Sequence, residues 1–204
     1  MHKTFTAAIL AATIALPAQA GTITDTFTSF YSFGDSLTDD GKFGALSAPS
    51  LDGRFTNGLT WAEYIEDDFI AAGHDTGNLA LGGATAGPVN LNPAGPLSTF
   101  GGQIATFAGA LAAGVGLPTK ILPSLETKPN GPAPGSNPLV SVWFGANDIF
   151  QGFNPIDAAN SVADGIRAIG SIAGHSFDDF LVMSLPDIGQ TPAFSGAGSA
   201  AATA

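Results

Sequence analysis

The chain has 204 residues, no cysteine and a formal net charge of -11, with 17 acidic against 6 basic residues. This balance argues against nucleic-acid binding and against attachment to anionic membranes, because both need clustered Lys and Arg side chains. Without cysteine there is no disulfide framework, so packing must stabilise the fold.

The first twenty residues are typical of a secretory signal peptide. Lys3 supplies a positive charge, residues 7–16 are apolar, and Ala18-Gln19-Ala20 is a small-residue cleavage site. The apolar segment is shorter than the roughly 20 residues that cross a bilayer, although an uncleaved membrane anchor is the alternative. We expect a secreted product, periplasmic or extracellular, in which residues 21–204 form one domain without stable membrane insertion.

Strand and helix patterns alternate after a polar, mobile lead-in at 21–28. Apolar runs bounded by turn residues predict strands at 29–33, 78–81, 139–144 and 180–185, and all except the second are expected to be buried. Apolar residues at helical spacing predict helices: 61–72 capped by Thr60, 98–113, and 155–169 capped by Asn154. The proline-rich stretch 118–138 predicts a long irregular loop. This order implies a parallel sheet with right-handed crossovers.

Several side chains invite a functional reading but are interpreted as structural. Trp61, Tyr64 and Phe69 recur at helical spacing and are interpreted as a core stripe of helix 61–72. The paired acids lack the alternating spacing of a calcium loop, so we expect a solvated surface: Asp39, Asp40, Asp67, Asp68, Asp178 and Asp179. The sequence contains no phosphate loop, zinc spacing or dinucleotide fingerprint, and we expect no metal and no cofactor.

Polar groups follow three of the predicted strands. Ser36, Gly83 and Asn147 each lie in a turn just beyond a strand, and carboxyl ends of parallel strands meet at one sheet edge. A serine there can act as a nucleophile, a glycine N–H can face a ligand closely, and an Asn amide can donate a hydrogen bond. Each position alone also fits an ordinary turn or cap. Together they predict an acyl-transfer site.

In this order the segments resemble those of the GDSL lipases and acylhydrolases, also called SGNH hydrolases. Residues 33–39 resemble the first block of the family, and 53–58 resemble a segment common in its larger lipase-like members. Residues 78–85 resemble the second block, 145–148 the third, and 185–192 a segment near the fourth strand. Five segments in the right order make the resemblance specific.

The resemblance implies a flavodoxin-like, three-layer α/β/α fold and hydrolysis of a small-molecule or lipid carboxylic ester through an acyl-enzyme on Ser36. The oxyanion hole would consist of the N–H groups of Ser36 and Gly83 and the side chain of Asn147. One departure is Lys42, where many of these lipases carry Asn. The other is the last block, Asp-x-x-His, which does not occur in the sequence.

No histidine is expected near Ser36. His74 and His175 precede strands, so both are expected as solvated loop residues at the opposite sheet edge, whereas a general base must lie within about 3 Å of its proton. We therefore expect the catalytic His and Asp beyond Ala204, with this chain the C-terminally truncated, nearly inactive front part of a longer enzyme. The alternatives are a non-catalytic secreted acyl- or glycan-binding protein on the same scaffold, and an extracellular structural segment. The identity of the ester and the oligomeric state stay open.

Overall fold

A parallel sheet forms the centre of the protein. The computed structural model describes residues 22–43, 50–118 and 131–190. Its four strands are β1 (Ser29–Gly34), β2 (Asp75–Asn78), β3 (Pro138–Trp143) and β4 (Asp179–Val182). They lie in the order β2-β1-β3-β4, and all three pairings are parallel, which confirms the predicted α/β class.

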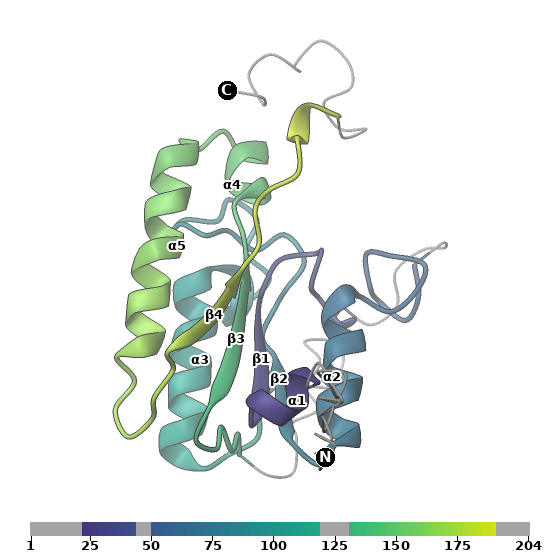
Figure 1. The fold of residues 1–204 in the computed structure, drawn as a ribbon. Helices are drawn as coiled ribbons and strands as arrows, with labels where there is room; N and C mark the ends of the chain where they lie inside the picture. Colours follow the sequence, from purple (N-terminus) through teal and green to yellow (C-terminus); the bar gives the residue numbers. More distant parts are fainter. Residues whose placement is uncertain (1–21, 44–49, 119–130, 191–204) are drawn as a thin grey trace, which may run out of the picture.

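Helices cover both faces of the sheet and give three layers (Figure 1). α2 (Trp61–Ala71) packs against β1 and β2 on one face, where the short α1 (Ile23–Thr26) adjoins the same apolar cluster. α3 (Phe100–Ala113) and α5 (Pro155–Gly170) contact each other on the opposite face. The short α4 (Ala146–Phe150) follows β3 at the carboxyl edge of the sheet. Two 3-10 turns complete the described elements: Pro96–Ser98 and Ile188–Gln190.

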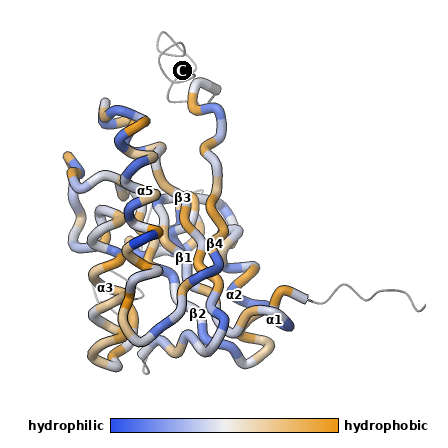
Figure 2. The backbone as a smooth tube through the Cα atoms, turned by 60° about the vertical axis from the view of Figure 1, so that its left-hand side comes forward, coloured by the Kyte–Doolittle hydropathy of each residue, from blue (hydrophilic) through white to orange (hydrophobic). Residues whose placement is uncertain are grey.

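Alternation along β1 produces two apolar cores. Tyr31 and Phe33 face α3, where both pack against Phe107, with ring centroids at 4.8 and 5.5 Å. Phe30 faces α2 and stacks on Phe69, with ring centroids at 5.7 Å. Every residue of β1 is buried, as expected for a central strand covered on both sides. Figure 2 shows hydrophobic residues along β3, which pairs with β1 at the centre of the sheet.

The predicted helix starts at Thr60 and Asn154 are confirmed. The Thr60 hydroxyl accepts from the Glu63 N–H, and the Glu63 carboxylate accepts from the Thr60 N–H at 2.8 Å, which is a capping box. The Asn154 side chain accepts from the Ile156 N–H at 2.9 Å. Each cap satisfies an N–H group that has no partner within its helix. α3 begins at Phe100, two residues later than predicted.

Two strands differ from the sequence prediction. β2 ends at Asn78, where the predicted strand 78–81 begins. The prediction missed β2 because its residues are polar and carry no hydrophobic pattern. The chain nevertheless continues beside β1, since the N–H groups of Leu79 and Leu81 donate to β1 carbonyls. The predicted buried strand 180–185 is wrong in burial: β4 is the edge strand of the described sheet, and Leu181 and Val182 are exposed.

Two further expectations are wrong, and two concern residues that the structure does not describe. The segment 21–28, expected as a polar lead-in, contains α1. Ile23 of α1 packs against the apolar cluster between α2 and the sheet. Tyr64 is 62% exposed, because the buried stripe of α2 runs through Ala62 and Phe69 instead. The predicted signal peptide and residues 119–130 lie outside the described residues. Within the described ranges, no helix has the length and apolarity that a membrane crossing requires.

Candidate active site

Ser36 lies in a tight turn directly after β1. The Asp35 carbonyl accepts from the N–H groups of Thr38 and Asp39, both at 3.0 Å. The Asp35 carboxylate accepts from the Leu37 N–H at 3.1 Å. Ser36 itself is partly exposed and lies within this hydrogen-bonded turn.

The two glycines after Leu81 have different tasks. The Gly82 N–H donates to Asp39 Oδ2 at 2.7 Å, and a Cβ at Gly82 would lie 2.1 Å from a ring carbon of Phe55. Gly83 is exposed, with φ at +79°, and among the described residues its N–H has no acceptor. The first glycine thus makes room for Phe55, and the second leaves a backbone donor available to a ligand.

Asn147 lies in the first turn of α4 and is tied to the loop that contains Gly83. Its Nδ2 donates to the carbonyl of Ala84 at 2.9 Å. The neighbouring Asp148 carboxylate accepts from the Ala86 N–H at 2.8 Å, which fixes the same loop to α4. Because an amide nitrogen carries two hydrogens, one hydrogen of the Asn147 amide is not used by this bond.

The sheet order places Ser36 with this pair. β1 lies between β2 and β3, and Gly34 is paired with the last residue of β3 while its carbonyl accepts from the Leu81 N–H. Ser36 therefore follows the central strand, with Gly83 following β2 on one side and Asn147 following β3 on the other. The structure brings all three predicted site residues to one sheet edge, and their chemical roles stay predictions.

Asp35 is buried beneath the site. Burial raises the pKa of this carboxyl to about 7; the Leu37 N–H opposes the rise, and the charges of Asp148 and Asp39 add to it. Its Oδ2 atom has no hydrogen-bond partner among the described residues. A buried carboxyl with one unpaired oxygen favours its neutral form.

Asp39 was expected at a solvated surface, which is wrong. It is fully buried, and its two oxygens accept from the N–H groups of Lys42 at 2.9 Å and Gly82 at 2.7 Å. Burial raises its pKa above the ordinary value. These backbone N–H groups supply the hydrogen bonds that the buried carboxylate needs. The acid pairs at 67–68 and 178–179 are exposed, as expected.

Lys42, the departure from the family pattern, is fully buried as well. Its Nζ donates to Asp40 Oδ1 at 2.6 Å and to Asn78 Oδ1 at 3.3 Å. The Asn78 amide in turn donates to the Thr38 carbonyl at 2.9 Å. Lys42 therefore links the serine turn to the end of β2.

Gln103 of α3 was not identified from the sequence. It is fully buried, and its Oε1 accepts from the Gly34 N–H at 3.1 Å. Its Nε2 donates to the carbonyls of Gly34 and Leu97, at 2.8 and 2.9 Å. The side chain thus fixes the strand end two residues before Ser36. The sequence feature that could have identified Gln103 is a polar residue on the apolar face of an Ala- and Gly-rich helix.

A cavity of about 260 Å³ opens beside the turn that contains Ser36. Aromatic rings from two elements form part of its wall, with Trp61 and Trp143 at 6.0 Å between centroids. We call it the serine-side cavity, and its lining is Ser36, Leu37, Phe55, Thr56, Leu59, Thr60, Trp61 and Trp143.

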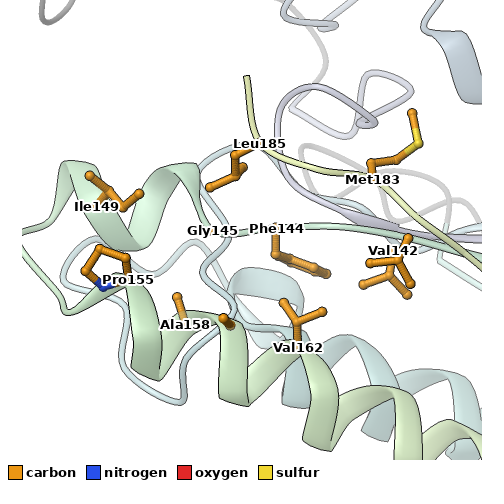
Figure 3. Close-up of a pocket in the computed structure, with 11 residues that line it drawn as sticks. Val142, Phe144, Gly145, Ile149, Pro155, Ala158, Val162, Met183 and Leu185 are labelled. Atoms are coloured by element: carbon orange, nitrogen blue, oxygen red, sulfur yellow. The ribbon is translucent and has the colours of Figure 1, made fainter. Parts of the chain in front are cut away.

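A second, apolar pocket of about 310 Å³ lies between α5, the end of β3 and the chain after β4 (Figure 3). Val142 lines it from β3, and Phe144 lines it from the position directly after that strand. Val162 lines it from α5, and Leu185 lines it from the chain after β4. None of the three predicted site residues lines this pocket. Its size alone therefore does not connect it with the chemistry.

The two described histidines lie at the opposite sheet edge, as predicted. His74 directly precedes β2, with its Nε2 at 3.1 Å from the Thr24 carbonyl oxygen. His175 lies between α5 and β4 and packs against Phe177, with ring centroids at 5.8 Å. Both are half-buried rather than solvated. Among the described residues, no histidine lies at the carboxyl edge with Ser36.

Comparison with known proteins gives the family and the fold. The sequence pattern of the family described as GDSL-like Lipase/Acylhydrolase matches residues 30–203. Phosphatidylcholine-sterol acyltransferase of Aeromonas hydrophila is 31% identical over 188 residues, which are 88% of this chain and 50% of that protein. The chain thus spans about half the length of this curated relative. Est24, a carbohydrate acetylesterase from Sinorhizobium meliloti, aligns with a TM-score of 0.50 and 19% identity, over 85% of this chain and 74% of that one. This likeness concerns the fold.

Proposed function

The chain belongs to the GDSL-like Lipase/Acylhydrolase family, and on this premise we propose that Ser36 is the nucleophile of a secreted ester hydrolase or acyltransferase. One observation carries the proposal: Ser36, Gly83 and Asn147 follow three adjacent parallel strands at one edge. The Gly83 N–H has no acceptor among the described residues, and Asn147 keeps an amide hydrogen beside it. Secretion rests on the sequence of residues 1–20 alone.

In this mechanism the Ser36 hydroxyl oxygen attacks the ester carbonyl carbon as its proton passes to a base. The Ser36 and Gly83 N–H groups and the Asn147 amide bind the negative charge that develops on the carbonyl oxygen. The alcohol leaves with a proton, and the acyl group stays on Ser36. Water then releases an acid, or a second alcohol takes up the acyl group as a new ester.

We infer that the base is a histidine, oriented by an aspartate, in the part of the protein beyond Ala204. Two observations support this: no described histidine lies at the carboxyl edge, and the chain spans half of its curated relative. Loss of such a histidine can cost on the order of a million-fold in rate. The 204-residue chain alone is therefore expected to be nearly inactive.

Since no described histidine lies beside Ser36, a second candidate is a non-catalytic secreted protein that binds an acyl or glycan group there. Labelling with a fluorophosphonate separates the two. In the full-length protein we expect one phosphonyl adduct on Ser36, none in Ser36→Ala, and unchanged labelling in the control Ser161→Ala, whose serine lies on α5. The 204-residue chain should label far more slowly. A full-length protein that never labels at Ser36 would contradict the enzyme and leave the binder.

A further inference from the structure

We propose that the serine-side cavity is the acyl-chain subsite of this enzyme and accepts one linear, saturated chain rather than a sugar. The inference rests on the proposed role of Ser36, because that residue lines the cavity and would carry the acyl group. A chain attached to Ser36 would begin in this cavity and not in the pocket of Figure 3, which Ser36 does not line.

The wall of the cavity is mainly apolar. Five of its eight lining residues are large hydrophobics: Leu37, Phe55, Leu59, Trp61 and Trp143. The Thr60 hydroxyl is already engaged, since it donates to Glu63 Oε2 at 3.0 Å and accepts from the Glu63 N–H at 3.4 Å. The indole nitrogens of Trp61 and Trp143 are buried and have no hydrogen-bond partner among the described residues. Sugar hydroxyls placed here would lose their hydrogen bonds to water with few partners in exchange.

The wall is also held in place before any ligand binds. Arg54 donates from Nε at 2.8 Å and from Nη2 at 2.5 Å to the two oxygens of Glu63, which fixes the preceding loop to the start of α2. The next residue, Phe55, packs edge-on against Phe43 at 5.9 Å and lies over the bare backbone of Gly82. A preformed wall reduces the ordering cost of binding.

Exposure and size indicate what the cavity accepts. Phe55 is 49% exposed and Leu37 is 41% exposed, although both are large hydrophobics next to the nucleophile. Apolar side chains gathered at such a place mark a binding surface. The volume of about 260 Å³ lies below the roughly 300–1,000 Å³ of pockets for drug-sized ligands, which fits a single chain better than a bulky group.

Tryptophan fluorescence tests this directly, because the chain has two tryptophans and both line the cavity. The 204-residue chain is titrated with n-butanol, n-hexanol and n-octanol, and with methyl glucoside. We expect the affinity to rise by up to about fourfold for each added methylene, the value for full burial. Methyl glucoside should leave the emission unchanged.

Matched variants locate the binding. Phe55→Ala should weaken octanol binding about tenfold, whereas Phe150→Ala should not change it. Phe150 is a fair control because it is 45% exposed and lies on α4, outside the cavity lining. Leu59→Ala serves as a second test if Phe55→Ala does not fold.

An affinity independent of chain length, equal losses in Phe55→Ala and Phe150→Ala, or a response to methyl glucoside would overturn the proposal. Fluorophosphonate labelling of the full-length protein is a separate readout. A Ser36 adduct without octanol binding defeats the acyl subsite and leaves the ester chemistry. Octanol binding without an adduct keeps an apolar-chain site and defeats the nucleophile.

Discussion

Replacing Asp35 with Asn should stabilise the protein at neutral pH and not at acidic pH. Burial raises the pKa of this carboxyl to about 7 from an ordinary value of 3.8, so the folded protein holds a proton that the unfolded chain releases. Between about pH 4 and pH 7 the free energy of unfolding therefore falls as pH rises. Three pKa units correspond to about 4 kcal/mol at most. Asn is neutral at every pH and keeps an oxygen that can accept from the Leu37 N–H.

Urea unfolding of the 204-residue chain and of Asp35→Asn across this range measures the effect. The free-energy difference between the two proteins should grow by about 2–4 kcal/mol from pH 4 to pH 8 in favour of the variant. Asp67→Asn is the matched control, since that side chain lies in water on α2. A difference that stays constant with pH, or grows in favour of the natural chain, would refute the argument.

Three further predictions concern the groups around the site. Gly82→Ala should displace the Phe55 ring, because the new Cβ would lie 2.1 Å from a ring carbon, and octanol binding followed by tryptophan fluorescence should weaken several-fold; unchanged binding would contradict this packing. Gln103→Leu removes the side-chain oxygen that accepts from the buried Gly34 N–H and should cost about 1–3 kcal/mol in urea unfolding, so a neutral effect would show that the contact matters little. Burial acts to raise the pKa of Glu63, but the hydrogen bonds of its carboxylate to Arg54 and Thr60 lower it more. Ionised Glu63 therefore stabilises the fold above about pH 4, and this contribution is lost as pH falls. A Glu63→Gln variant as stable as the natural chain at pH 7 would contradict this sign.

The sequence predicts well those strands whose own residues are mainly apolar. β1 and β3 are rich in large apolar residues, and almost every residue of both strands is buried in the centre of the sheet. β2 escaped the pattern because Asp75-Thr76-Gly77-Asn78 is polar and becomes buried only beside β1. β4 shows the opposite error, since an apolar run forms an exposed edge strand in the described sheet.

The candidate site also contains residues that the sequence could predict and residues that it could not. Ser36, Gly83 and Asn147 could be placed from the sequence because each follows a strand, and parallel topology brings such positions together. Asp39 and Gln103 could not, because their partners lie far away in the chain: Asp39 binds the Gly82 N–H, and Gln103 binds Gly34. Long-range hydrogen bonds of this kind leave no periodic trace in a sequence.

The central claim is that Ser36 carries the acyl group during turnover. Full-length protein mixed with a p-nitrophenyl ester and quenched rapidly in acid should yield a Ser36 peptide heavier by one acyl group. The adduct should disappear in Ser36→Ala together with ester turnover. Ester turnover that persists in Ser36→Ala, or an acyl group found on another residue, would contradict the account.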